Sequence, residues 1–234
     1  MNNKCGSSLP PVGEPEGVLI KVCGMRDAEN IRAVEALGVQ WMGFIFWPGS
    51  KRYVSEHPSY LPTKCKRVGV FVDADITEVL QKVEEFALDL IQLHGSESPE
   101  YISQLTSFHP HSIVHCPLSI IKAFNIATPA DLQQTSAYEN IVDYFLFDTK
   151  GKSLGGNGEQ FDWRILDHYH GHTPYLLSGG IGPDDANRVK DFITSHLSPL
   201  TSHLLGLDLN SRFETSPGVK DIESLRRFLT QFTH

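Results

Sequence analysis

Residues 18–46, VLIKVCGMRDAENIRAVEALGVQWMGFIF, contain two short apolar runs separated by one amphipathic run. Val18–Val22 and Trp41–Phe46 are rich in β-branched, aromatic and other apolar residues, a composition that favours strands. Between them, apolar residues recur at helical spacing over Ala28–Leu37, after a capping aspartate and before a glycine. Because helical crossovers join parallel strands, this stretch predicts a βαβ unit.

Strand-like and helix-like segments continue to alternate after this unit. Further strands are predicted at Arg67–Val72, Leu88–Leu93, Ile120–Phe124, Val142–Phe147, Tyr175–Leu177 and Leu204–Leu209. Further helices are predicted at Ile76–Phe86, Pro99–Leu105, Pro129–Ala137, Phe161–Tyr169, Asp184–Ile193 and Val219–Phe232. The second unit is the weak one, because residues 55–63 contain two prolines and can hold little helix. Eight strand–helix units predict an α/β fold, a single-domain (β/α)8 TIM barrel over residues 18–234, with a doubly wound open sheet as the competing fold.

The composition limits the classes of partner. Lys and Arg number 20 against 28 Asp and Glu, which gives a formal net charge of −8. Nucleic-acid binding depends on clustered positive charge, so no nucleic-acid partner is expected. No apolar run approaches the ~20 residues that span a bilayer, so no membrane partner is expected either.

Cysteine usage and the N-terminal stretch indicate a reducing compartment. Cys5, Cys23, Cys65 and Cys116 are the four cysteines, and no two of them form a CxxC pair. Neither a zinc ribbon nor a disulfide scaffold is therefore expected. Residues 1–17 are rich in Pro, Gly and Ser and lack the apolar centre of a secretory signal. We expect them to form a flexible extension of a cytoplasmic protein.

In a barrel, the functional groups lie just after the strands, at their carboxyl ends. The residues at these positions are Cys23, Arg52, His94, Asp148, Ser178, Gly179, Gly180, Asn210 and Ser211. They comprise a candidate base, a candidate acid, an arginine and two polar loops. The sequence therefore predicts one site at one rim of the barrel, with a small molecule as its partner.

Two glycine-rich loops at this rim are suited to a phosphate. Backbone N–H groups can approach an anion closely only where no Cβ intrudes. The first loop contains Gly155, Gly156, Asn157 and Gly158, and the second contains Ser178, Gly179 and Gly180. The loops that follow the seventh and eighth strands are the usual phosphate site of such barrels.

Eight short motifs, taken in order, resemble the phosphoribosylanthranilate isomerase family of tryptophan biosynthesis. The resemblance runs from about residue 18 to the C-terminus, so only the first 17 residues fall outside it. The motifs are KVCGM at 21–25, GFIFWPGSKR at 43–52, QLHG at 92–95, FDT at 147–149, GGNG at 155–158, SGG at 178–180, GLDLNS at 206–211 and ETSPGVKD at 214–221.

The resemblance implies a (β/α)8 barrel and an Amadori rearrangement that uses no cofactor and no metal. It implies that Cys23 is the general base, that Asp148 is the general acid and that Arg52 meets the anthranilate carboxylate. The glycine loops would hold the phosphate. His94 would contact the substrate or only complete the end of its strand, and Asp208 would point into the barrel behind the groups that touch substrate. Docking to other tryptophan-pathway enzymes is a further possibility that the resemblance raises.

The chemistry sets requirements for the base and the acid. A free cysteine with a pKa of ~8.5 is mostly thiol at neutral pH, so the surroundings of Cys23 are expected to favour the thiolate. Asp148 needs a raised pKa in order to donate a proton near neutrality. One departure from the family is Arg212, where many members carry a small residue. The sequence therefore does not predict which groups after the eighth strand contact the phosphate.

Two other classes of function compete with this interpretation. One is a related barrel enzyme that acts on another sugar phosphate. A histidine-pathway aminoaldose isomerase would use two aspartates, whereas this chain has Cys23 at the first strand. An indole-glycerol-phosphate synthase would need a catalytic lysine at a strand end, and none of the barrel-facing candidates fits that role. The other class is a non-catalytic barrel that only binds a sugar phosphate, and it would not need Cys23 and Asp148.

Overall fold

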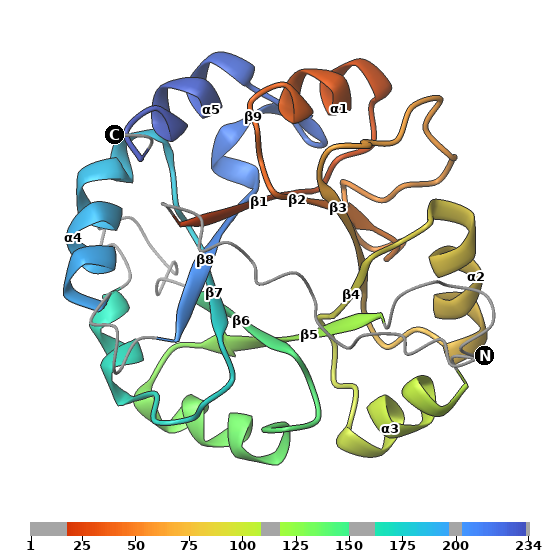
Figure 1. Cartoon of the computed structure of the whole chain (residues 1–234), viewed down its shortest axis with the longest axis vertical. Coiled ribbons are helices and arrows are strands. Elements are labelled where there is room, and N and C mark those ends of the chain that lie inside the picture. Colours follow the sequence, from red (N-terminus) through yellow and green to blue (C-terminus); the bar gives the residue numbers. More distant parts are fainter. Residues whose placement is uncertain (1–17, 109–117, 150–161, 197–202, 233–234) are drawn as a thin grey trace, which may run out of the picture.

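The computed structural model describes residues 18–108, 118–149, 162–196 and 203–232. Within these ranges, eight parallel strands pair in chain order and close into a barrel, because β8 pairs with β1 (Figure 1). The strands are β1 Leu19–Cys23, β2 Trp41–Ile45, β3 Lys66–Phe71, β4 Leu90–Leu93, β5 Ser119–Ile126, β6 Tyr144–Thr149, β7 Tyr175–Ser178 and β8 Leu204–Leu209. The closure confirms the predicted barrel, and the open sheet is wrong.

The helices form a ring around the strands (Figure 1). The α-helices are α1 Ala28–Glu35, α2 Ile76–Phe86, α3 Pro99–Ser107, α4 Ala186–His196 and α5 Ile222–Leu229. The 3-10 segments are η1 Pro129–Ala137, η2 Trp163–His168, η3 Pro183–Asp185 and η4 Ser211–Phe213. No helix in the described ranges is long and apolar enough to cross a bilayer.

Three of the predicted helices differ in detail from the structure. The segments expected as helices after β5 and β6 are 3-10 helices. The last helix was expected from Val219, but Val219–Lys220 forms strand β10, which pairs with β9 Glu214–Ser216. Helix α5 begins only after Asp221, whose side chain accepts hydrogen bonds from two backbone N–H groups of the first turn. Between β2 and β3 the structure contains no helix, as the prolines there predicted.

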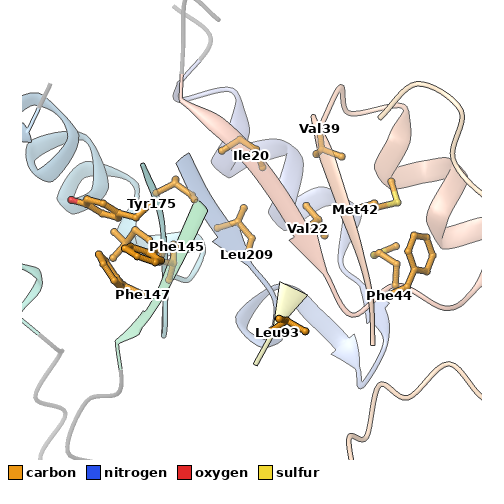
Figure 2. Packing of buried hydrophobic residues seen from close by; sticks show 14 of the residues in the cluster. Ile20, Val22, Val39, Met42, Phe44, Leu93, Phe145, Phe147, Tyr175 and Leu209 are labelled. Carbon is orange, nitrogen blue, oxygen red and sulfur yellow. The ribbon is translucent and has the colours of Figure 1, made fainter. Parts of the chain in front are cut away.

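Alternate residues of each strand face opposite sides of the barrel wall. Those that face outward pack against the helices and form the large hydrophobic core; Figure 2 shows Ile20 and Val22 of β1 in this core together with Phe44 of β2 and Leu209 of β8. A second apolar cluster fills the barrel interior and consists of Leu19, Trp41, Val68, Leu90, Ile121, Ala123, Leu146 and Leu176. Beyond this cluster, toward the carboxyl ends of the strands, the interior becomes polar.

Candidate active site

A cavity of about 180 Å³ lies at the carboxyl ends of the strands. Nine of the residues expected in the site line it: Cys23, His94, Asp148, Ser178, Gly179, Gly180, Asp208, Asn210 and Ser211. Arg212 also lines it, as do four residues that the sequence did not single out, Gln92, Ile45, Val70 and Ile181. Gly155, Gly156, Asn157 and Gly158, the other predicted loop, lie outside the described residues.

Cys23 is the last residue of β1, and its side chain is buried at the floor of this cavity. Gly43 is its partner in the neighbouring strand, and a Cβ at that glycine would lie only 2.7 Å from the Cys23 Sγ atom. A glycine at position 43 is therefore what leaves room for the thiol. Burial raises the pKa of Cys23, although the ammonium groups of Lys21 and Lys220 act to lower it. The expectation that its surroundings favour the thiolate is wrong for this structure, because desolvation outweighs both cations.

Directly below Cys23, β1 places a lysine inside the barrel. The Lys21 Nζ atom lies 2.8 Å from the Asp208 Oδ1 atom, and both side chains are buried. Although burial opposes the charge, Asp208 holds the pKa of Lys21 above its ordinary value, so this side chain is an ammonium. Asp208 points into the barrel as expected, and its other carboxylate oxygen accepts a hydrogen bond of 3.4 Å from Ser178 Oγ.

Lys21 also bears on the argument from the sequence that no barrel-facing lysine fits the catalytic role in a synthase. Lys21 does face the interior, but it lies in the middle of β1 and is paired with Asp208 rather than free at a strand end. Its position was recognisable: strand alternation places it on the same face as Leu19 and Cys23, and a charged residue there needs a partner.

His94 and Asp148 face each other across the cavity. The His94 Nε2 atom is 3.8 Å from the Asp148 Oδ2 atom, and the Nδ1 atom is 3.0 Å from the carboxamide nitrogen of Gln92. Burial lowers the pKa of His94, against the opposite influence of Asp148, so the imidazole is neutral. The structure therefore places the candidate acid beside a neutral histidine.

Arg52 does not line the cavity but lies at its edge, packed over Gly24 and close to Asn210. Its Nε and Nη2 atoms donate to both carboxylate oxygens of Glu214, with the shortest contact at 2.6 Å. Glu214 is only 4% exposed and is also paired with Lys220 at 2.6 Å. Although burial acts to raise it, the hydrogen bonds from Arg52 and Lys220 hold the pKa of Glu214 below its usual value.

This arrangement leaves one edge of the arginine available. Within the described ranges, no hydrogen bond of Arg52 to another residue uses its Nη1 atom. Sequence reasoning identified the arginine but not Glu214 or Lys220, although both belong to the quoted motif at 214–221. Both are separated from Arg52 by more than 160 residues in sequence, so only the closed barrel brings them together.

The other end of the cavity has the features of an anion site. Gly179 and Gly180 follow β7 with φ angles of 96° and 70°, a left-handed conformation that favours glycine. The guanidinium of Arg212 lies against Gly182, where a Cβ would be 3.1 Å from its Nη2 atom. Backbone amides of glycines and an arginine thus meet at one end of the cavity. Among the described residues, no group of three or more His, Cys, Asp or Glu side chains could hold a metal ion.

A larger hollow, of about 730 Å³, lies at the opposite end of the barrel. It is lined by amino-terminal strand residues, among them Trp41 and Tyr144, and by the half-buried Cys65. Burial raises the pKa of Cys65 to about 12, so its thiol is a poor nucleophile and base at neutral pH. The smaller cavity, which contains the candidate acid, the candidate base and the glycine loop suited to an anion, is the better candidate despite its size.

Comparison with known proteins agrees with this geometry. A family model for N-(5'-phosphoribosyl)anthranilate isomerase matches residues 20–231. The chain belongs to this family. It is 46% identical to the N-(5'-phosphoribosyl)anthranilate isomerase of Phocaeicola vulgatus, over 92% of this chain and 97% of that protein. The phosphoribosylanthranilate isomerase structure from Thermotoga maritima superimposes with a TM-score of 0.71 at 27% identity, over 92% and 98% of the two chains. A phosphoribosylanthranilate isomerase solved with reduced 1-(o-carboxyphenylamino)-1-deoxyribulose 5-phosphate gives a TM-score of 0.70 at 26% identity, over 92% and 97% of the two chains.

Proposed function

We propose that this cavity converts N-(5'-phosphoribosyl)anthranilate to 1-(2-carboxyphenylamino)-1-deoxyribulose 5-phosphate, with Cys23 as general base and Asp148 as general acid. The chain is an isomerase of tryptophan biosynthesis by its family, so the proposal concerns which of its groups do the chemistry. The observation that carries it is that a thiol and a carboxyl group line one cavity, beside a glycine loop suited to phosphate.

The reaction needs one proton donated and one removed. Asp148 protonates the ring oxygen of the furanose, and the C1–O bond breaks as the substrate nitrogen forms an iminium. The Cys23 thiolate then removes the proton from C2, and the electron pair moves to the nitrogen to give an enolamine. The enolamine gains a proton at C1 and loses the hydroxyl proton at C2, which yields the ketone. A well-placed acid or base contributes typically ~10²–10⁴-fold to such a step.

Cys23 has to lose its proton before it can act. Its pKa is raised, so the thiol predominates, and the ammonium groups of Lys21 and Lys220 are the groups that stabilise the thiolate once it forms. Lys21 is itself held in place by Asp208. We therefore assign Asp208 to the support of the base, through Lys21, rather than to direct contact with the substrate.

The two ends of the substrate bind to different parts of the rim. The free edge of Arg52 is suited to the anthranilate carboxylate, because an arginine fork bonds a carboxylate better than a lysine does. The phosphate is assigned to the loops at Ser178–Gly180 and Asn210–Ser211, with Arg212 as an added cation. The loop at 155–158 is proposed as the remaining side of the phosphate site.

The direct test is to follow the fluorescence of phosphoribosylanthranilate after the purified chain is added. We expect the fluorescence to fall at a rate proportional to enzyme concentration, and Asp148→Asn to slow it by at least about 100-fold. A chain that binds a product analogue but leaves the fluorescence unchanged would instead be a sugar-phosphate-binding barrel without activity.

Two further parts of the proposal concern the cell. We place the enzyme in the cytoplasm, because a thiol base must stay reduced and glutathione and thioredoxin maintain thiols there. Docking to other tryptophan-pathway enzymes is proposed as well. Co-elution of the chain with such an enzyme in gel filtration, at micromolar concentrations of both, is the measurement that tests it.

A further inference from the structure

Gln92 of β4 is a carboxamide residue that lines the cavity. It is 1% exposed and faces the barrel interior. Its register neighbours in β3 and β5 are Val70 and Ile121, which have no side-chain group that can form a hydrogen bond. The carboxamide therefore has no side-chain partner at its own level on either neighbouring strand.

Half of the Gln92 carboxamide has a partner and half has none. The nitrogen contacts His94 Nδ1 at 3.0 Å, whereas the oxygen is buried without a hydrogen-bond partner. A buried unpaired carbonyl bears its full desolvation penalty, so an apolar residue here would be better for stability alone. Leu90 and Leu146 fill equivalent inward positions lower in the barrel. Stability does not explain a glutamine at this position.

The contact to His94 also fixes which ring nitrogen carries the proton. A carboxamide N–H that donates to Nδ1 requires the neutral ring to carry its hydrogen on Nε2, which faces the Asp148 carboxyl group at 3.8 Å. If the carboxamide were turned around, its oxygen would accept from Nδ1–H. Once Asp148 had given up its proton, the bare Nε2 lone pair would then face a carboxylate, which repels it. In the orientation that the structure shows, Gln92 donates to Nδ1 and the Nε2–H group faces Asp148, so both contacts of the ring are favourable.

We propose that Gln92 positions His94 and binds the substrate: its nitrogen holds the imidazole with Nε2–H directed at Asp148, and its oxygen accepts a hydrogen bond from a hydroxyl of the bound aminoaldose. The inference rests on the proposed function for the identity of the ligand. A ribosyl hydroxyl is the donor that fits, because Gln92 lines the cavity that also contains Cys23, the proposed base at C2, and its oxygen has no partner within the protein.

The two contacts of Gln92 serve successive stages of the reaction. The hydroxyl contact orients the sugar above Cys23 before the C2 proton is removed. The Nε2–H group of His94 stabilises the Asp148 carboxylate after that residue has given its proton to the ring oxygen. Gln92 thus links the binding of the sugar to the stability of the ionised Asp148 carboxylate, without exchanging a proton itself.

The test replaces Gln92 by methionine, which has a similar length and no hydrogen-bonding carboxamide. We expect Gln92→Met to lower kcat/KM by roughly 10–100-fold, with KM raised and kcat lowered, while the melting temperature stays the same or rises because the unpaired oxygen is gone. The matched control is Ile121→Met, which puts the same side chain on the neighbouring strand. The control is expected to keep kcat/KM within about twofold of wild type.

A second measurement needs no turnover. In ¹⁵N-labelled enzyme, the His94 ring is expected to show a protonated Nε2 and an unprotonated Nδ1 in the wild type and to lose this preference in Gln92→Met. Wild-type kcat/KM in Gln92→Met, or a His94 ring protonated on Nδ1 in the wild type, would overturn the inference. A wild-type enzyme without isomerase activity would refute the proposed function instead, and the ring spectrum would still decide whether Gln92 positions His94.

Discussion

The two ends of the barrel interior differ sharply, although the same eight strands build both. The amino-terminal end is filled by side chains such as Trp41, Leu90 and Leu146, with no charge among them. Two residues further along β1 and β8 the interior holds the buried ion pair of Lys21 and Asp208, and above it the polar cavity. Strand alternation decides which side chains face inward, whereas position along the strand decides whether they stabilise the fold or perform chemistry.

The largest expected effect is at the polar end, where Cys23→Ser should remove the base without removing substrate contacts. We expect kcat to fall by about 10²–10⁴-fold and KM to change little, because a serine hydroxyl is a far weaker base than a thiolate. Steady-state kinetics measure this, with Cys65→Ser as the control, since Cys65 lies in the hollow at the opposite end. Equal losses in kcat and in affinity would contradict the base role.

At the apolar end, Leu146→Ala should have the opposite profile. The side chain is fully buried in the interior cluster, so its truncation leaves a cavity and should lower the free energy of unfolding by about 2–5 kcal/mol. The kcat of the folded enzyme should stay close to wild type. Urea denaturation and kinetics on the same sample measure both, and Leu146→Met, which preserves volume, should cost less than about 1.5 kcal/mol. A large loss of kcat in Leu146→Ala would mean that the two ends are not separable.

At the rim, Arg52→Ala should act on binding rather than on turnover. Loss of an arginine contact to a carboxylate is expected to raise KM by about tenfold or more, with kcat nearly unchanged. Glu214→Gln removes the charge that orients Arg52 but keeps the arginine, so it should raise KM by less. An unchanged KM in Arg52→Ala would exclude this residue from recognition of the anthranilate carboxylate.

The comparison of the two ends also explains what the sequence could predict. The alternation of strands and helices predicted a barrel, with an open sheet as the competing fold. The positions of Cys23 and Asp148 at strand ends made them candidates, and the family resemblance suggested their roles. The contacts of Arg52 with Glu214 and of Lys21 with Asp208 did not, because each joins residues more than 160 positions apart. No local pattern encodes such a pairing; it appears only when β8 closes against β1.

The direction in which the pKa of Cys23 is shifted was also beyond what the sequence could predict. The sequence suggested nearby groups that favour the thiolate, and the structure does contain them in Lys21 and Lys220. Desolvation is a property of the whole packed cavity, however, and it outweighs both charges. The sign of the shift therefore depends on a balance that only coordinates reveal.

The smallest expected effect, and the one that tests this balance, is on the pH dependence of kcat/KM. Activity requires the thiolate, so kcat/KM should rise with pH as Cys23 loses its proton, and the raised pKa places this rise above that of an ordinary cysteine. Asp208→Asn removes the anion that holds the pKa of the buried Lys21 above its ordinary value, so Lys21 no longer supports the thiolate through its charge and the rise should move to higher pH. In Lys21→Met/Asp208→Asn the loss of the cation outweighs the loss of the anion, because Lys21 has the stronger influence on Cys23. The rise should then move to higher pH, by up to about one unit, which corresponds to 1.36 kcal/mol. An unchanged rise, or a rise at lower pH, in both variants would show that the ion pair does not support the thiolate through charge.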